Sequence, residues 1–188
     1  FSGGLFQNVA LNQNLLDGEF RDVYFPSAPS DSGLSLGAAL FVKNKRVSNS
    51  RKILSAYLGP SFSNSEIKQV LDSHKLIYSK PKDLIKRSAQ LISLGNTIGL
   101  FRGRGEYGPR SLGNRSLVAD PRKIRSKEKI NQLLKKRDWF MPYAPSILEE
   151  DYRNWVDKEH YSPYMQVAFF MKKDKRSKVP SAVHVDGT

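Results

Sequence analysis

The chain has 188 residues, 31 of them Lys or Arg and 18 Asp or Glu, so its formal net charge is +13 at pH 7. With 39% hydrophobic residues it can bury a core, and without cysteine it has no disulfide framework, thiol nucleophile or Cys-based zinc site. Its apolar runs are far shorter than the roughly 20 residues that span a bilayer. A chain this basic is expected to bind an anionic partner, such as nucleic acid, a membrane surface or a phosphorylated small molecule.

The first part of the chain, residues 1–42, is predicted to be the end of an α/β unit. Apolar residues over 5–16 recur close to helical spacing, residues 23–25 are a short β-prone run, and small apolar residues over 34–40 predict a buried helix. Residues 43–56 are polar and basic and carry few core candidates. This change in composition predicts a linker between two domains.

A second unit is predicted over residues 57–188. Ser63 and Glu66 have the spacing of a capping box, which predicts a helix that begins there. Apolar residues recur at helical spacing over 84–92, and the run 96–101 is β-prone. Both features are typical of a folded domain with helices and strands.

Three further elements are predicted towards the C-terminus: a helix over 126–137 with Ile130, Leu133 and Leu134 inward, and strands over 164–171 and 182–185. Helices that alternate with strands indicate an α/β or α+β layered fold. The chain begins within a Ser-Gly-Gly run and stops within the run HVDGT, so we expect it to be a piece of a longer protein.

The strongest chemical signal lies in residues 101–116, which contain four glycines and four arginines directly after the β-prone run. Glycines let the backbone approach a ligand closely, and guanidinium groups match the oxygens of phosphate and carboxylate. Glu106 in the same segment is expected either to orient a guanidinium group or to help hold a metal. The segment predicts a site for a phosphorylated ligand, because fixed cations lower the barrier where charge develops on phosphate oxygens.

Two alternatives stay open for the basic residues. The segment 101–116 is also compatible with a solvated loop whose side chains satisfy its own carbonyl groups. A second cluster, residues 135–145, mixes cations with aromatic residues and prolines. It predicts either a rigid wall that holds Lys135 or Arg137 over a pocket, or simple core packing.

These motifs resemble those of a known family. The run GRGEYGPRSLGNRS of residues 103–116 is similar to the motif GRxEfGPRALGnRS of the NodU/CmcH-type O-carbamoyltransferases. Further blocks of that family resemble, in the same order, SGGLFQNVALN, PSAPSDSGLSLGAAL, YLGPSFSNSEI, ADPR, KKRDWFMPYAPSILEED and HVDGT. Seven ordered motifs are a far more specific signal than any one of them.

The resemblance implies two domains. Residues 1–42 would be the C-terminal end of an actin-like ATPase-fold domain that carries out carbamoyl transfer, residues 43–56 a linker, and residues 57–188 a YrdC-like domain with a twisted mixed sheet and helices. The YrdC-like domain would use carbamoyl phosphate and ATP to form carbamoyl adenylate. The first domain would pass the carbamoyl group to a hydroxyl acceptor with the help of a transition metal, whose histidine ligands lie upstream of this chain.

The resemblance also implies site residues. Arg110 and Arg115 would clamp phosphate oxygens, and Lys135 would neutralise charge as phosphate leaves. Asn114 and Thr188 would hydrogen-bond to carbamoyl or phosphate groups. The substrate- and nucleotide-binding residues that it implies are Arg104, Asn114, Ser116, Arg137, His184, Asp186, Gly187 and Thr188, together with Gly3, Gly4, Asn8, Asp31 and Gly33 in the first domain. It assigns no metal ligand to this chain, and His184 is equally compatible with a structural role.

The implied cofactors are ATP and Mg²⁺, and the implied partners are carbamoyl phosphate and a hydroxyl-bearing acceptor. We expect a cytoplasmic protein that contacts no membrane, with a homodimer as one assembly to test. Nucleic acid is not expected as a partner. The main alternative is nevertheless an RNA- or tRNA-binding YrdC-related module that uses its basic surface. A second alternative is a docking domain with a lost activity, which Met141 suggests because many members of the family have an arginine there.

Overall fold

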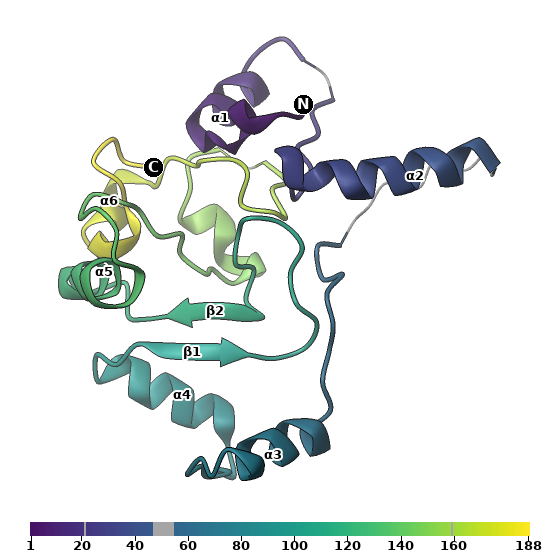
Figure 1. Ribbon diagram of the computed structural model, residues 1–188. Helices are drawn as coiled ribbons and strands as arrows, with labels where there is room; N and C mark the ends of the chain where they lie inside the picture. Colours follow the sequence, from purple (N-terminus) through teal and green to yellow (C-terminus); the bar gives the residue numbers. More distant parts are fainter. Residues whose placement is uncertain (21, 47–54, 159) are drawn as a thin grey trace.

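The computed structural model describes residues 1–20, 22–46, 55–158 and 160–188, and it shows a mixed α/β chain with a small sheet near its centre (Figure 1). The prediction of an α/β or α+β chain is confirmed at this coarse level. Within the described residues the sheet has two antiparallel strands, so the larger mixed sheet that we expected is not formed there.

The sheet is a hairpin whose loop is the arginine-rich segment. Strand β1 (Ile98–Phe101) pairs with strand β2 (Arg115–Val118), and Phe101 lies opposite Arg115. The β-prone run 96–101 contains β1, which confirms that prediction, whereas β2 shows no strand pattern in the sequence. Because the two strands are paired, the ends of the arginine-rich loop are held side by side.

Helix α4 (Leu84–Ser93) lies next to the hairpin on the lower side of Figure 1, and helix α3 (Asn64–Ser73) lies below α4. Helix α3 begins with the predicted capping box, in which Ser63 N donates to Glu66 Oε2 at 2.7 Å and Glu66 N donates to Ser63 Oγ at 3.2 Å. Helix α4 confirms the second prediction and ends just before Gly95, whose φ of 91° suits glycine.

The helix expected after the hairpin changes its winding along its length. Helix α5 (Ile124–Lys129) continues as a π-helix over Ile130–Lys135. Ile130 is buried, as expected, but Leu133 and Leu134 are 68% and 51% exposed. The expectation that these leucines face inward is therefore wrong, because the wider π turn breaks the 3.6-residue spacing on which it depended.

The N-terminal segment contains one of the predicted helices but not the predicted strand. Helix α1 (Val9–Leu16) is capped by Asn8, whose side chain accepts from Ala10 N at 3.1 Å and Leu11 N at 3.2 Å. The strand expected over 23–25 is wrong, since these residues join no strand ladder among the described residues.

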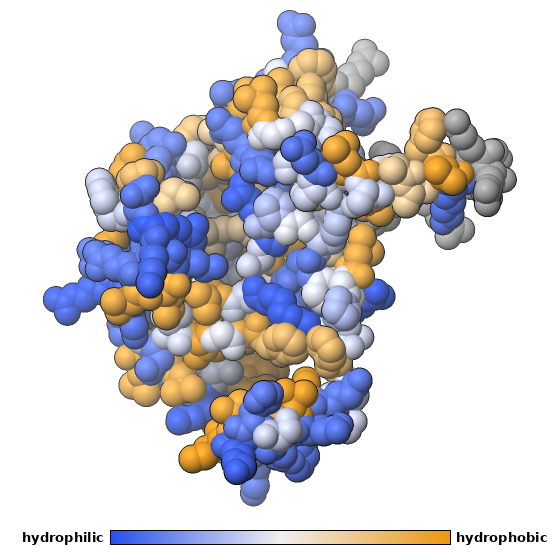
Figure 2. Space-filling view, in the orientation of Figure 1, coloured by the Kyte–Doolittle hydropathy of each residue, from blue (hydrophilic) through white to orange (hydrophobic). Residues whose placement is uncertain are grey.

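Helix α2 (Leu34–Arg46) projects from the body of the molecule (Figure 1). It was expected as a buried helix, but Leu34 and Phe41 are 70% and 62% exposed, and Figure 2 shows apolar side chains along the projecting arm. The helix runs into the predicted linker 43–56, of which residues 47–54 lie outside the described residues. None of the described helices has both the length and the apolar character needed to cross a bilayer.

The two strands expected near the C-terminus are wrong. Over 164–171, only Met171 takes part in a bridge, with Val156, among the described residues. A 3-10 helix, Pro180–Ala182, and a turn stand where a strand over 182–185 was expected. The other helical segments outside the regions above are the 3-10 helices Gly4–Gln7, Asp31–Gly33 and Glu149–Asn154, and helix α6 (Lys173–Arg176).

Buried amide side chains connect the N-terminal segment to residues 164–171. Asn12 is fully buried, and its Nδ2 donates to Gln166 O at 2.6 Å. Gln166 in turn donates from Nε2 to Ser27 O at 3.1 Å. Residues on both sides of the predicted domain boundary therefore pack together, in a core whose buried apolar side chains are Phe25, Ala28, Ala56, Ile130, Val156, Tyr164, Val167, Met171, Val179 and Ala182.

Candidate functional site

The loop between β1 and β2, which we call the arginine loop (residues 102–114), depends on glycines at its turns. Gly103, Gly108 and Gly113 have φ angles of 50°, 123° and 99°, a region that favours glycine. At Gly108 a Cβ atom would also lie 2.3 Å from the carbonyl oxygen of Ser27. The loop therefore packs closely against the backbone of the N-terminal segment.

Most guanidinium groups of this region donate to backbone carbonyl groups. Arg115 lies 3.7 Å over the ring of Phe101 and donates from NH1 to Arg102 O at 2.7 Å. Arg104 donates to Gly59 O at 2.9 Å and to Leu58 O at 3.1 Å. These contacts agree with the alternative in which the loop satisfies carbonyl groups of its own chain, so Arg104 and Arg115 have a structural role whatever they bind.

The two polar residues beside Arg115, Asn114 and Ser116, also form hydrogen bonds within this region. Asn114 donates from Nδ2 to Arg104 O at 2.7 Å, and Ser116 Oγ accepts from Gly113 N at 2.9 Å. The side chains that the sequence singles out for ligand binding therefore also hold the shape of the loop.

Arg110 differs from the other arginines of the loop. Its NH2 donates to Gln7 O at 2.9 Å, whereas its Nε is buried and has no acceptor among the described residues. A buried donor without an acceptor costs about 1–3 kcal/mol, so an anionic oxygen or a water molecule is expected to satisfy it. Arg110 thus keeps donor capacity for a ligand and also fastens the loop to the N-terminal segment.

The structure brings the arginine loop next to the candidate nucleotide-contacting residues of the N-terminal segment. Tyr107 donates from its hydroxyl to Ser32 O. Tyr107 and Gly33 both line a groove of about 700 Å³, together with Ser2, Ser30, Leu34 and other residues of the N-terminal segment and α2. The two candidate regions, distant in the sequence, therefore share one surface.

The individual N-terminal candidates have local structural roles as well. Asn8 caps α1, Gly4 begins a 3-10 helix, and Gly3 donates its N–H to Pro29 O. A Cβ atom at Gly33 would lie 2.2 Å from Ala28 O, so the close approach of two backbone segments requires glycine there. Asp31 begins the 3-10 helix Asp31–Gly33 and is exposed.

The second cluster, residues 135–145, is organised around one buried amide. Asn131 is fully buried, donates from Nδ2 to Trp139 O at 3.3 Å and to Met141 O at 3.1 Å, and accepts from the hydroxyl of Tyr143. Arg137 lies 4.8 Å over the Tyr143 ring, and its Nε is buried with no acceptor among the described residues.

Lys135 lies apart from the buried groups of this cluster. It ends the π-helix and is exposed, as is Trp139. The loop therefore presents two exposed lysines, Lys135 and Lys136, and the half-buried Arg137.

The HVDGT run forms a tight turn around Asp186. Asp186 Oδ1 accepts from Thr188 N at 2.9 Å and Thr188 Oγ1 at 2.8 Å, and it lies 3.1 Å from His184 Nδ1. The hydrogen bond from the Thr188 backbone and these neighbours hold the pKa of Asp186 below its ordinary value. Gly187 is buried, and a Cβ atom there would lie 2.3 Å from the guanidinium carbon of Arg176.

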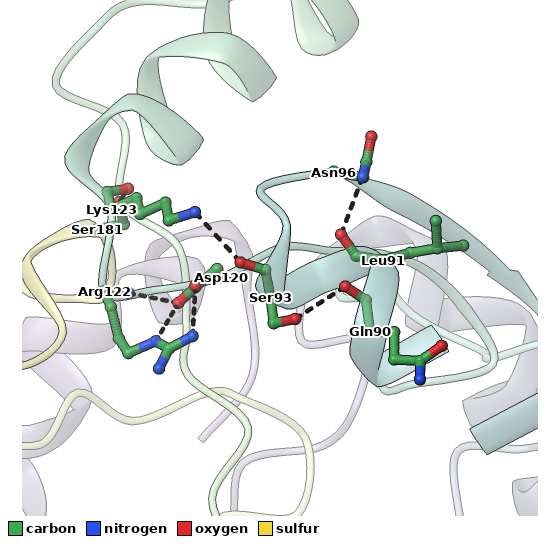
Figure 3. Close-up of polar contacts among 8 residues, drawn as sticks. All are labelled: Gln90, Leu91, Ser93, Asn96, Asp120, Arg122, Lys123 and Ser181. Atoms are coloured by element: carbon green, nitrogen blue, oxygen red, sulfur yellow. Dashed lines mark hydrogen bonds and ion pairs between the residues drawn. The ribbon is translucent and has the colours of Figure 1, made fainter. Parts of the chain in front are cut away.

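A turn after β2 attaches the C-terminal part of the chain to the hairpin (Figure 3). Lys123 donates from Nζ to Ser93 O at 3.2 Å, and the hydroxyl of Ser181 donates to Lys123 O. Asp120 and Arg122 form an ion pair at 2.8 Å in the same turn. The segment before the HVDGT turn is therefore bound to the turn after β2, and that turn is itself bound to α4 through Lys123.

The predicted catalytic cations do not line either of the two hollows that we describe. The groove of about 700 Å³ contains Tyr107 of the arginine loop, and a second hollow of about 420 Å³ is lined by residues such as Trp155, Lys172 and Asp174. Arg110, Arg115 and Lys135 contribute to neither. The candidate cations thus lie on separate loops, and we do not observe the closed cavity that the sequence led us to expect.

The comparison with known families shows to which family the segment with these loops belongs. Residues 89–188, which include the arginine loop, Lys135, Arg137 and the HVDGT turn, match the family described as Carbamoyltransferase C-terminus. The chain belongs to this carbamoyltransferase family. The predicted resemblance is therefore confirmed on the part of the chain that carries most of the candidate site residues.

Whole-chain similarity extends beyond the matched family segment. The chain is 36% identical to nodulation protein NolNO of Sinorhizobium fredii and 36% identical to nodulation protein NolO of Bradyrhizobium diazoefficiens, in both cases over all of its length. It is also 35% identical to an uncharacterized protein of Methanocaldococcus jannaschii. Because these alignments cover 29%, 36% and 32% of the relatives, this carbamoyltransferase chain spans about a third of their length.

Two residues with central positions, Asn131 and Asp120, were not singled out as functional from the sequence, and a third, Glu106, was singled out with different partners. Asn131 organises the Lys135–Arg137 loop, and Asp120 organises the turn after β2. Glu106 binds three backbone N–H groups of the arginine loop. The only local signal for these residues is a polar side chain among buried or turn-forming neighbours, which does not reveal its partners.

Proposed function

We propose that this chain is the C-terminal portion of an ATP-dependent O-carbamoyltransferase. The match of residues 89–188 to the carbamoyltransferase family carries the proposal. In the proposed reaction, carbamoyl phosphate, water and ATP give carbamoyl adenylate with release of phosphate and pyrophosphate, and the carbamoyl group then passes to a hydroxyl group of an acceptor with release of AMP. The similarity to nodulation proteins over the whole chain supports the extension beyond the matched segment.

The proposal includes an arrangement of domains. Residues 57–188 would belong to a YrdC-like domain that forms the adenylate, and residues 1–42 to the end of an actin-like domain that performs the transfer. The contacts of Arg110 with Gln7 and of Tyr107 with Ser32 support a shared site, because they join the two segments at the arginine loop. A cytoplasmic location is part of the same proposal.

The donors of the described residues suit anionic substrates. The buried Nε groups of Arg110 and Arg137 have no acceptor within the described part of the chain, and both arginines belong to the residues that the family resemblance assigns to ligand binding. In the proposed roles, Arg110 and Arg115 bind phosphate oxygens, and Lys135 neutralises charge as phosphate leaves. Fixed donors of this kind stabilise the transition state because charge develops on the oxygens that they contact.

Magnesium would enter with ATP in this scheme. The described residues contain no group of three or more His, Asp or Glu side chains that could hold a metal ion. A protein cage is not required, since Mg²⁺ in nucleotide sites takes many of its ligands from phosphate oxygens and water. The ion would neutralise phosphate charge, while the residues of this chain bind and orient the anions.

The proposal is tested by incubating the full-length protein with ATP, carbamoyl phosphate and Mg²⁺ and searching for carbamoyl-AMP by mass spectrometry. We expect the wild type to form it, and Arg110→Ala to form it about a hundredfold more slowly, the usual effect of losing one anion-stabilising donor. Arg125→Ala, on the exposed surface of α5, serves as the matched control. A wild type that forms no carbamoyl-AMP contradicts the proposal, and strongly salt-dependent tRNA binding by that protein would favour the RNA-binding alternative.

A further inference from the structure

One carboxylate oxygen organises the arginine loop from within. Glu106 Oε1 accepts hydrogen bonds from Leu112 N at 3.0 Å, Asn114 N at 2.7 Å and Arg115 N at 3.1 Å. The three donors lie six to nine residues further along the chain. The loop is therefore folded around this single oxygen atom.

The arrangement requires a negative charge at its centre. Backbone N–H groups that converge on one point form a concave site for an anion. Burial raises the pKa of Glu106, but the hydrogen bonds from Asn114, Arg115 and Leu112 outweigh it and keep the pKa below its ordinary value of 4.5. The side chain is thus ionised at neutral pH and serves as the internal anion of this site.

The three bonds fix the backbone from which two candidate ligand-binding side chains extend. The Arg115 guanidinium lies over the Phe101 ring at 3.7 Å and donates to Arg102 O. The Asn114 amide donates to the carbonyl oxygen of Arg104 on the other side of the loop. Both side chains are directed by a backbone conformation that Glu106 holds.

We propose that Glu106 is a positioning residue for anion binding by Arg115 and Asn114. This inference depends on the proposed function, because it assigns those two side chains to the phosphate groups of carbamoyl phosphate or ATP. It differs from both earlier expectations for Glu106, since its carboxylate oxygen is used by backbone N–H groups rather than by a guanidinium group or a metal.

The test uses the full-length protein with the variants Glu106→Gln, which keeps the shape of the side chain, and Glu106→Ala. Glu66→Gln is the matched control, since Glu66 also accepts from a backbone N–H, that of Ser63 at 2.7 Å, but on α3 outside the loop. Two quantities are measured: amide hydrogen exchange in peptides that cover 102–118, and the Kd for carbamoyl phosphate and for inorganic phosphate.

We expect exchange over 102–118 to accelerate about tenfold or more in Glu106→Gln and further in Glu106→Ala, because each lost bond involved a charged acceptor. The Kd of the folded protein for both anions is expected to rise about tenfold in Glu106→Gln. Glu66→Gln should leave both quantities at their wild-type values. A purely structural role would instead change exchange and thermal stability together and leave the anion affinity of the folded protein intact.

The outcomes separate this inference from the proposed function. If the wild type binds phosphate and both Glu106 variants bind it with the same Kd, the positioning role is overturned. Accelerated exchange in the variants without any loss of anion affinity overturns it as well. A wild type that binds neither anion also overturns it. A wild type that binds phosphate in a Glu106-dependent manner but forms no carbamoyl-AMP supports the inference and contradicts the proposed function.

Discussion

Asp120 binds the guanidinium group of Arg122 through two side-chain hydrogen bonds, from Nε to Oδ1 at 2.9 Å and from NH2 to Oδ2 at 2.8 Å. The backbone N–H of Arg122 donates to the same carboxylate at 3.0 Å. Asp120 is 1% exposed, whereas the Arg122 side chain is 65% exposed. A buried carboxylate thus fixes the turn that contains Lys123 (Figure 3). From this turn the Lys123 ammonium group donates to Ser93 O, and Lys123 O accepts from the Ser181 hydroxyl.

Removing this carboxylate is expected to destabilise the fold. Asp120→Ala should lower the free energy of unfolding by about 2–3 kcal/mol, because three hydrogen bonds to a charged, buried acceptor are lost. Asp174→Ala, which breaks the exposed pair with Lys175, should cost less than about 1 kcal/mol. Chemical denaturation of both variants measures the difference, and equal losses would show that the turn does not depend on Asp120.

The same contact makes stability depend on acidic pH. Hydrogen bonds from Arg122 hold the pKa of Asp120 below its ordinary value of 3.8, although burial acts in the opposite direction. A carboxyl group with a lowered pKa in the folded state contributes stability above its unfolded pKa and loses it as the pH falls through the folded value. We therefore expect the unfolding free energy of the wild type to decrease as the pH is lowered beyond about 4.

The pH effect is isolated by comparison with Asp120→Asn. Asparagine has no carboxylate that could take up a proton at that position. The stability of the variant should therefore decline less over the same acidic range than that of the wild type. Unfolding free energies from denaturant curves at several pH values provide the measurement. Parallel curves for the two proteins would show that another carboxyl group dominates the acid sensitivity.

The loop that carries Lys135 and Arg137 is expected to depend on Asn131. Asn131→Ala should lower the unfolding free energy by about 2–3 kcal/mol, because the buried amide that donates to the carbonyl groups of Trp139 and Met141 is lost. It should also change the fluorescence of Trp139. Gln132→Ala, an exposed neighbour on the same helix, is the control and should alter neither quantity. If the fluorescence of Asn131→Ala stays at its native value, the amide does not hold the loop.

Elements defined by neighbouring residues could be predicted from the sequence, and elements defined by distant partners could not. The capping box of Ser63 and Glu66 and the apolar spacing of α4 are local, and both helices form as expected. Strand β2 has no local pattern and exists because it pairs with β1. The alternation over 164–171 suggested a strand, but alternation alone supplies no partner strand among the described residues.

The same distinction applies to the candidate site. Composition was enough to single out the arginines and glycines of residues 101–116, and the family match covers that segment. It could not reveal that Arg104 donates to Gly59 or that Arg110 donates to Gln7, since these carbonyl groups lie 45 and 103 residues away. The role of Glu106 was missed because its partners are backbone N–H groups, which every residue except proline carries.

The approach of the arginine loop to the N-terminal segment gives a final prediction. Gly108 has a φ of 123°, and a Cβ atom there would lie 2.3 Å from Ser27 O and 2.9 Å from Ser27 C. Since backbone atoms cannot move aside like the end of a flexible side chain, Gly108→Ala must displace one segment. We expect a loss of about 2 kcal/mol or more in unfolding free energy, from backbone strain and overpacking together.

The control for this substitution is expected to act in the opposite direction. Gly37 lies in α2, and no atom comes within 4 Å of the position that its Cβ would take. Gly37→Ala should therefore stabilise the protein by up to about 1 kcal/mol, because alanine has the higher helix propensity. Thermal and chemical denaturation of both variants give the comparison. If Gly108→Ala is as stable as the wild type, the arginine loop does not lie against Ser27, and the shared surface of the two segments must be abandoned.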